Sequence, residues 1–348
     1  MNGVAHDSRR MVGTWLLVCC VAVFAMVLLG GVTRLSGSGL SMVEWKPITG
    51  LLPPVTQTEW EAQFQLYQQS PEFRLKNSHM DLDGFKSIFW MEYLHRLLGR
   101  AIGVIFLLPL IYFAVTRRVG RGYLPRLLFM FLLGGLQGLL GWYMVKSGLV
   151  NDPHVSQYRL TAHLGLAFLI FALIFWSALD LFYPRATVME RGDRGLRWLS
   201  SVVSIVVFLA VLSGGLMAGT KAGLAYNSFP LMDGQLIPEG LLTLKPVWVN
   251  PFENVTTIQF DHRLFALLQF LLVSLCCFLA LRRPIERRLR IGCYLLLLVL
   301  LIQITLGVAT LLARVPLPLA AAHQGTALLL FTLTLYLNQG LLRRNPAG

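Results

Sequence analysis

The stretch MEYLHRLLGR, residues 91–100, places one histidine at the beginning of an apolar run that continues to about residue 116. Three other stretches repeat this form: RLTAHLGLA (159–167), QFDHRLFA (259–266) and AAAHQGTA (320–327). Ionisable side chains at membrane depth are costly, and they usually serve a function. We therefore interpret the histidines of the four stretches as paired ligands for two metal cofactors: His95, His163, His262 and His323.

The composition indicates a membrane protein. The chain has 348 residues, 55% hydrophobic and 14% charged, with a mean hydropathy of +0.63 and a net charge of +13. Surplus basic residues in such a chain usually mark cytoplasmic loops. No basic patch with interleaved aromatic residues argues for a nucleic-acid partner. The five cysteines all fall inside apolar runs and form no CxxC or CxxCH motif, so we expect small buried side chains and no covalently attached haem.

Eight apolar runs have about the length that crosses a bilayer core. We place them near 14–32, 94–116, 125–145, 160–182, 198–219, 262–281, 291–313 and 321–341. The first run is too long for a signal peptide, and no A-x-A cleavage site follows it. These runs predict an all-α integral membrane protein with eight transmembrane helices.

The charges of the loops predict the orientation. Arginines cluster at 9–10, 117–126, 185–197, 282–290 and 343–344, and these groups alternate with loops that carry most of the acidic residues. The positive-inside rule then places both termini in the cytoplasm and the long loops 33–93 and 220–261 outside. All four histidines would lie at similar depth, close to the outer surface. No mitochondrial presequence is visible, which favours a bacterial inner membrane.

The two halves of the chain resemble each other. LLGGVTRLSGSGLSM (28–42) is similar to LSGGLMAGTKAGLAY (212–226), with a constant offset of 184 that maps Gly30 onto Gly214. The pair His95–Arg96 recurs as His262–Arg263, and AHLGLAFLIFALIF recurs as AHQGTALLLFTLTL. Each half then has four spans, an even number, which makes the repeats parallel. We expect two four-helix bundles, residues 1–190 and 191–348, each with two histidines.

A small residue follows each histidine by four positions, on the same helix face: Gly99, Ala167, Ala266 and Ala327. We interpret these residues, with Gly165 and Gly325, as room for a flat macrocycle. Haem iron commonly takes axial histidine. The repeat thus predicts two bis-histidyl haem sites, one from His95 with His163 and one from His262 with His323. The alternatives are interfacial histidines packed at helix ends and, less favoured, a zinc site. The other histidines, His6, His79 and His154, are interpreted as ordinary polar-region residues.

Four arginines near these histidines are candidate contacts for haem propionates, because arginine binds carboxylates with paired hydrogen bonds. They are Arg96, Arg100, Arg159 and Arg263. Anchoring at the membrane interface is an equally good interpretation of any one of them.

The halves differ three residues before their first histidine, where Glu92 in one half corresponds to Gln259 in the other. A glutamate at this spacing shares a helix face with His95, whereas the amide of Gln259 cannot exchange a proton at working pH. We expect Glu92 to act as an acid/base group in a catalytic N-terminal half. The C-terminal half would hold a permanent haem that moves electrons. The alternative for Glu92 is a salt bridge to Arg96, and the two roles can coexist.

At these residues the chain resembles the haem A synthase family. The resemblance rests on five stretches and covers nearly the whole chain: SGLSMVEWKPITGLLPP (38–54), EYLHRLLGR (92–100), TAHLGLA (161–167), ENVTTIQFDHR (253–263) and AAHQG (321–325). The first of these is most similar to the proteobacterial and mitochondrial branch. Some bacterial members carry a cysteine pair in the first outer loop, and this chain has none there.

The resemblance implies an oxidoreductase that converts haem O to haem A by oxidising the C8 methyl group to a formyl group through successive hydroxylations. It implies haem b bound through His262 and His323, substrate haem O between His95 and His163, and a catalytic Glu92. It also implies that haem O synthase, cytochrome oxidase assembly factors and membrane lipid are the partners of the protein. A homo-oligomer is a further alternative. The rival functions are an electron-transfer cytochrome b with two permanent haems and a histidine-lined metal transporter. Four histidines near one surface disfavour the first, and spans with Asp180 as their single acidic residue disfavour the second.

Overall fold

The computed structural model describes residues 6–45, 50–120, 122–150, 152–183 and 194–342. Eight of its helices are long and apolar enough to cross a membrane. They are α1 (His6–Leu35), α4 (Leu82–Val115), α5 (Leu124–Ser147), α6 (Gln157–Phe182), α7 (Arg194–Thr220), α9 (Val255–Leu281), α10 (Arg287–Leu312) and α11 (Leu317–Leu342). The predicted all-helical membrane fold with eight spans is confirmed.

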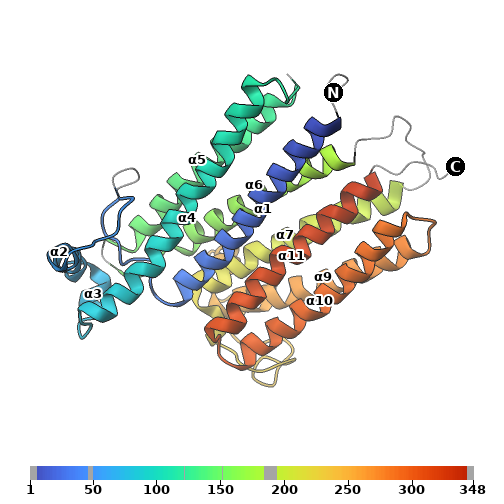
Figure 1. Cartoon of the computed structure of the whole chain (residues 1–348). Helices are drawn as coiled ribbons and strands as arrows, with labels where there is room; N and C mark the ends of the chain where they lie inside the picture. Colours follow the sequence, from blue (N-terminus) through green and yellow to red (C-terminus); the bar gives the residue numbers. More distant parts are fainter. Residues whose placement is uncertain (1–5, 46–49, 121, 151, 184–193, 343–348) are drawn as a thin grey trace.

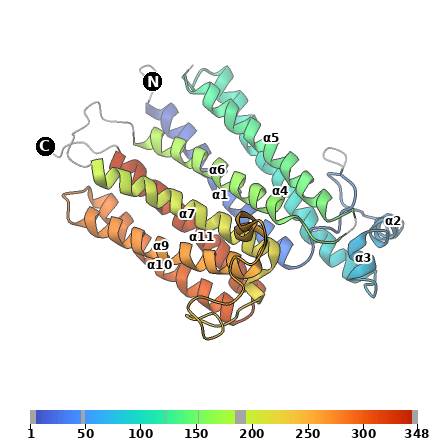
Figure 2. The same cartoon turned by 180° about the vertical axis from the view of Figure 1, so that it is seen from behind.

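The eight helices form one elongated bundle (Figure 1). Helices α1, α6, α7 and α11 pack in a ring at its centre, where α1 contacts α6 and α11, and α7 contacts the same two helices. Helices α4 and α5 lie on one flank of this ring, and α9 and α10 lie on the opposite flank in both views (Figure 2). This arrangement is consistent with two equivalent four-helix halves. The boundary predicted between them, at residues 190 and 191, lies outside the described residues.

Helix α1 begins, and helix α11 ends, at the same end of the bundle (Figure 1). The other end carries the short helices of the two long loops that the sequence predicts to be outside: α2 (Gln57–Gln68), α3 (Pro71–Leu75), the 3-10 helices η2 (Ala222–Leu224) and η3 (Val247–Val249), and α8 (Asn250–Glu253). Of the arginines that predicted the orientation, Arg121, Arg185, Arg191, Arg343 and Arg344 lie outside the described residues.

Helix α4 begins well before residue 94, where the apolar run suggested its start. Asp81 caps its first turn by accepting a hydrogen bond from the backbone N–H of Gly84 at 2.9 Å. Phe85, Phe89 and Tyr93 then recur at every fourth position and are all buried against the outer-loop helices. With 34 residues the helix is about 50 Å long, more than the bilayer core requires.

His95 stands at the beginning of its apolar run, but it lies more than three turns inside α4, so the predicted start of this span near residue 94 is wrong. His163, His262 and His323 lie within about two turns of the first residue of α6, α9 and α11. Helix starts are poorly predicted from hydropathy where a polar but amphipathic segment packs on a neighbouring element outside the membrane.

The five cysteines, Cys19, Cys20, Cys276, Cys277 and Cys293, are buried and unpaired. This agrees with their interpretation as small apolar side chains.

The outer helices enclose a buried carboxyl group. Glu72 of α3 is 5% exposed and accepts a hydrogen bond from the Tyr67 hydroxyl at 3.3 Å. Burial raises the pKa of Glu72 from its usual value to about 7, and the hydrogen bond from Tyr67 offsets part of that rise. In the folded protein this carboxyl therefore holds its proton more tightly than in the unfolded chain.

Because the folded state binds this proton more tightly, stability should fall as the pH rises from about 4.5 through about 7. We expect Glu72→Gln to leave the free energy of unfolding unchanged at pH 4 and to raise it at pH 8 by on the order of 2 kcal/mol. Thermal unfolding of the detergent-solubilised protein at both pH values measures this. Glu61→Gln, at an exposed carboxylate of α2, is the control. Equal pH dependence in wild type and Glu72→Gln would contradict the prediction.

Candidate functional site

Each of the four histidine rings lies on the backbone of a glycine in a neighbouring helix. A Cβ atom built on the glycine would lie 2.9 Å from Cε1 of His95 (Gly30), 2.9 Å for His163 (Gly141), 3.4 Å for His262 (Gly214) and 2.9 Å for His323 (Gly307). Contacts below about 3.0 Å leave no room for a side chain, so glycine is required under His95, His163 and His323, whereas the 3.4 Å contact under His262 is close to ordinary van der Waals distance. The sequence marked Gly30 and Gly214 as repeat positions, but it did not indicate this role.

The pairs sit between equivalent helices. His95 of α4 lies on Gly30 of α1, and His262 of α9 lies on Gly214 of α7. His163 of α6 lies on Gly141 of α5, and the second half repeats this with α11 and α10. The same ring-on-glycine contact thus occurs four times in related places.

The rings of His262 and His323 lie edge-to-face, with 6.5 Å between their centres and 77° between their planes. Two metal–imidazole bonds of about 2.0 Å, plus about 1.1 Å from each nitrogen to its ring centre, would span about 6.2 Å. The separation therefore fits one iron ion held between the two rings. His95 and His163 of the other half are near enough to interact electrostatically.

Two glutamines that sequence reasoning missed approach the histidines. The side-chain nitrogen of Gln137 lies 3.5 Å from Nε2 of His163, and that of Gln303 lies 3.4 Å from Nε2 of His323. Each glutamine is four residues before the glycine under the same ring, in LQGLLG (136–141) and IQITLG (302–307). The shared Gln-x3-Gly spacing was the signal that could have found them.

The hydrogen-bond partners of the histidine Nδ1 atoms differ between the two halves. Nδ1 of His262 lies 2.8 Å from the hydroxyl of Ser213, and Nδ1 of His323 lies 3.2 Å from the carbonyl oxygen of Gln303. In the other half, the Nδ1 atoms of His95 and His163 are buried and have no hydrogen-bond partner among the described residues. Ser213 is a further residue that the sequence did not single out.

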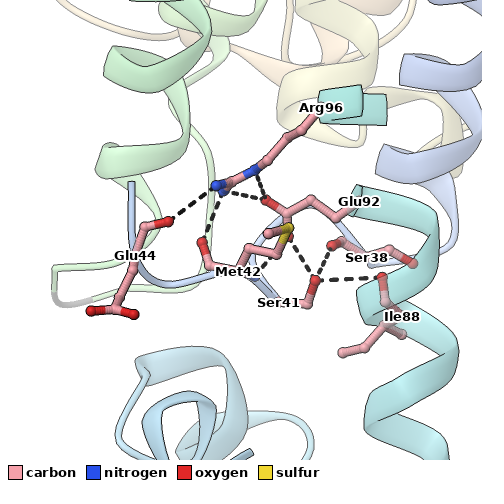
Figure 3. A network of polar contacts seen from close by, with 7 residues as sticks. All are labelled: Ser38, Ser41, Met42, Glu44, Ile88, Glu92 and Arg96. Atoms are coloured by element: carbon pink, nitrogen blue, oxygen red, sulfur yellow. Dashed lines mark hydrogen bonds and ion pairs between the residues drawn. The ribbon is translucent and has the colours of Figure 1, made fainter. Parts of the chain in front are cut away.

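Glu92 is 3% exposed and anchors the first outer loop to α4 (Figure 3). Its Oε2 accepts hydrogen bonds from the Ser41 hydroxyl at 2.7 Å and the Met42 backbone N–H at 2.8 Å. Its Oε1 accepts two from Arg96, at 3.1 Å from Nε and 2.6 Å from the terminal nitrogen. The salt bridge to Arg96 that the sequence offered as an alternative is therefore present, and it lies one turn from His95.

Arg96 also donates to the carbonyl oxygens of Met42, at 2.8 Å, and Glu44, at 3.1 Å (Figure 3). Arg263 in the second half donates to the carbonyl oxygens of Tyr226 and Ser228, at 3.3 Å and 2.9 Å. The repeat offset of 184 maps Met42 onto Tyr226 and Glu44 onto Ser228. Each arginine thus holds the same two positions of its own loop, and it could bind a propionate only by sharing its guanidinium with these carbonyls.

Gln259 takes the place of Glu92 in the second half and makes the reverse contact. It is fully buried, and its amide nitrogen donates to the carbonyl oxygen of Tyr226 at 2.9 Å. A carboxylate could not make this bond, because it has no hydrogen to donate.

The two remaining candidate arginines lie near the same sites. Arg159 donates to the carbonyl oxygen of Tyr143 at 2.8 Å and lies over the ring of that tyrosine, 3.6 Å from its centre. Arg100 follows Arg96 by one turn of α4. The propionate contacts of Arg159 and Arg100 stay predictions.

Trp45 extends the first outer loop across the outer ends of α4 and α5. Its ring lies 5.5 Å from the guanidinium carbon of Arg96 on α4 and 6.4 Å from the ring of Trp142 on α5. Trp142 follows Gly141, which lies under the His163 ring. Trp45 of the loop therefore contacts two helices that carry or support the histidines of this half.

The expected role of Gly165 and Gly325 is wrong. A Cβ atom built on Gly165 would lie 2.7 Å from Leu212 of α7, and one on Gly325 would lie 2.6 Å from Leu28 of α1. Both glycines are buried at helix crossings inside the central ring, so they permit close helix packing and make no room for a macrocycle.

The flanks are packed unequally. The buried share of the apolar segment is 17% for α4 and 6% for α5, compared with 28% for each of α9 and α10. The central helices of the two halves differ much less, with 39% for both α1 and α7. The N-terminal flank is therefore the more open one.

Comparison with known proteins supports one family over nearly the whole chain. Residues 13–335 match the family COX15-CtaA, described as cytochrome oxidase assembly protein. A "Heme A synthase" of Nitrosospira multiformis is 54% identical over 337 residues, 97% of this chain and 95% of that protein. The "Heme A synthase COX15" of Mus musculus is 47% identical over 351 residues, 98% of this chain and 84% of that protein.

Proposed function

Because the chain belongs to the COX15-CtaA family of cytochrome oxidase assembly proteins, we propose that it is a haem A synthase. It oxidises the C8 methyl group of haem O to a formyl group by successive hydroxylations. The product, haem A, serves terminal oxidases. The observation that carries this proposal is the pair of bis-histidine sites, each built from rings that lie on glycine backbone.

The two sites divide the work. His262 and His323 hold a resident haem b, which supplies one-electron transfer when bound; the 6.5 Å separation of their rings supports this assignment. His95 and His163 hold the substrate haem. The looser packing of α4 and α5 supports a site that a large apolar substrate enters and leaves.

Glu92 is the acid/base group of the reaction. The conversion of a methyl to a formyl group replaces two C–H bonds by one C=O bond. This four-electron oxidation needs an electron acceptor and an oxygen atom from outside the protein, and the protons that it releases must be taken up by a base. Glu92 lies one turn before His95 on α4, and the same position in the second half holds an amide. Its hydrogen bonds to Ser41 and Met42 also couple this carboxylate to the first outer loop.

The protein lies in a bacterial inner membrane with both termini in the cytoplasm and the histidine sites near the periplasmic side. The start of α1 and the end of α11 at one end of the bundle support this orientation, with the outer-loop helices at the other end (Figure 1). The partners are haem O synthase, which supplies the substrate, cytochrome oxidase assembly factors and the membrane lipid. A homo-oligomer fits the same assembly role.

Extraction of the pigments tests the function. Purified from cells that also express haem O synthase, the protein should carry haem B together with haem O, its hydroxylated product or haem A. The same protein from cells without haem O synthase should carry haem B alone, which is the control. Haem B alone under both conditions would contradict the proposal. Chromatography and mass spectrometry of the extracted haems distinguish these outcomes.

A further inference from the structure

Ser213 of α7 stands directly before Gly214, whose backbone supports the ring of His262. Its side chain is 8% exposed, and its hydroxyl oxygen lies 2.8 Å from the carbonyl oxygen of Ala210 and 2.8 Å from Nδ1 of His262. A serine hydroxyl has one hydrogen to donate, and a carbonyl oxygen can only accept. The hydroxyl therefore donates to Ala210 and accepts a hydrogen bond from Nδ1–H of His262.

This hydrogen bond selects one tautomer of His262. With the proton on Nδ1, the lone pair is on Nε2, which is the form that binds a metal ion. The other ligand of the pair is held in the same way, because its Nδ1 lies 3.2 Å from a carbonyl oxygen, that of Gln303. Both imidazoles of the C-terminal half are thus oriented for a metal before it binds.

The N-terminal half lacks this arrangement. The repeat offset of 184 maps Ser213 onto Leu29, which stands before Gly30 under the ring of His95. The leucine side chain has no atom that accepts a hydrogen bond, and Nδ1 of His95 is buried without a partner among the described residues. Buried polar atoms are normally hydrogen-bonded, so this ring is held less firmly in one tautomer and orientation.

We infer that Ser213 is a positioning residue that makes the C-terminal half retain its haem, and that Leu29 at the equivalent place lets the N-terminal half release its own. This inference rests on the proposed function and goes beyond it, because it names the side chain that separates a resident from an exchanging site. Hydrogen bonds to the second nitrogen of a ligating histidine orient the ring and raise its basicity. Their loss typically weakens metal binding by 10- to 100-fold.

The first arm of the test is Ser213→Ala. We expect its haem b affinity to fall by about 10- to 100-fold and its midpoint potential to rise, because a less basic imidazole stabilises ferric iron less well. Ser213→Thr keeps a hydroxyl and should restore both values. Ser204→Ala, at another buried serine of α7 that bonds to Asn338, is the control and should change neither. Haem transfer to apomyoglobin and a spectroscopic redox titration give the readouts.

The second arm is Leu29→Ser, which offers His95 the missing acceptor. We expect the protein purified from cells with haem O synthase to retain a larger amount of haem O or haem A than wild type, with haem B unchanged. Its turnover should fall, because the product leaves more slowly.

Unchanged potential and affinity in Ser213→Ala would overturn the inference, and so would unchanged haem retention in Leu29→Ser. Failure of the proposed function looks different: the wild-type protein would then carry haem B alone in the presence of haem O synthase. A Ser213→Ala protein that fails to fold leaves the Leu29→Ser arm to decide.

Discussion

Replacing His262 with alanine should remove the resident haem and its absorbance spectrum. We propose that His262 and His323 ligate one haem iron, and loss of a ligand should weaken binding by more than the 10- to 100-fold typical of a lost hydrogen bond to a ligand. His323→Ala should have the same effect. Reduced-minus-oxidised spectra and the haem content of the purified protein measure it.

His95→Ala is the matched variant, because His95 also lies on a glycine, in the equivalent place of the other half. It should keep the spectrum of the resident haem and lose the haem that is acquired when haem O synthase is present. If the resident spectrum survives in His262→Ala and disappears in His95→Ala, the assignment of the two halves is reversed.

Glu92→Gln should abolish formation of haem A while the substrate haem stays bound. General acid/base groups typically contribute 10²- to 10⁴-fold, so we expect a loss of about that size. Glutamine has nearly the shape of glutamate, and its carbonyl oxygen still accepts a hydrogen bond, but its amide does not accept protons. Retained haem O and the missing formyl product are measured together by pigment extraction.

The carboxylate also anchors the outer loop, so a control must separate the two roles (Figure 3). Ser41→Ala removes the 2.7 Å hydrogen bond to the carboxylate and leaves the carboxylate in place. We expect it to lower activity far less than Glu92→Gln does. Equal losses in both variants would make Glu92 a loop anchor, and full activity of Glu92→Gln would remove it from the mechanism.

Arg96 and Arg263 make closely matched contacts with the loops of the two halves. Arg96 and Arg263 donate hydrogen bonds to corresponding loop carbonyls, although the residues that carry these carbonyls differ, Met42 and Glu44 in one half and Tyr226 and Ser228 in the other. The residue one helical turn before each arginine then determines which backbone group of the loop is bonded. Glu92 accepts from the backbone N–H of Met42, whereas Gln259 donates to the carbonyl oxygen of Tyr226.

The sequence could predict features that depend on residues close together in the chain. The membrane fold with eight spans followed from apolar runs, because the bilayer demands about 20 apolar residues wherever a helix crosses it. The salt bridge between Glu92 and Arg96 was foreseeable because i and i+4 positions share a helix face. The beginning of α4 was missed because Phe85 and Phe89 are buried by separate outer helices.

Contacts between helices had to come from the tertiary structure. Gly165 and Gly325 each follow a histidine by two residues, and this spacing suggested room for a macrocycle. In the structure they pack against Leu212 and Leu28. The partner of each histidine Nδ1 depends on the rotation and spacing of two helices to within an ångström. A hydrogen bond of 2.8 Å exists only at that precision.

The four histidines, their pairing by the repeat and the Glu92/Gln259 difference were thus determined by the sequence alone, because each is a property of positions along one helix or of two similar segments. Only the tertiary structure decided that the rings lie on glycine backbone and that Nδ1 of His262 and of His323 approaches Ser213 and the carbonyl of Gln303, while Nδ1 of the other pair has no partner in the part of the chain that the structure describes. Those features arise where helices far apart in the chain meet, and short-range contacts there are set by packing of the whole bundle.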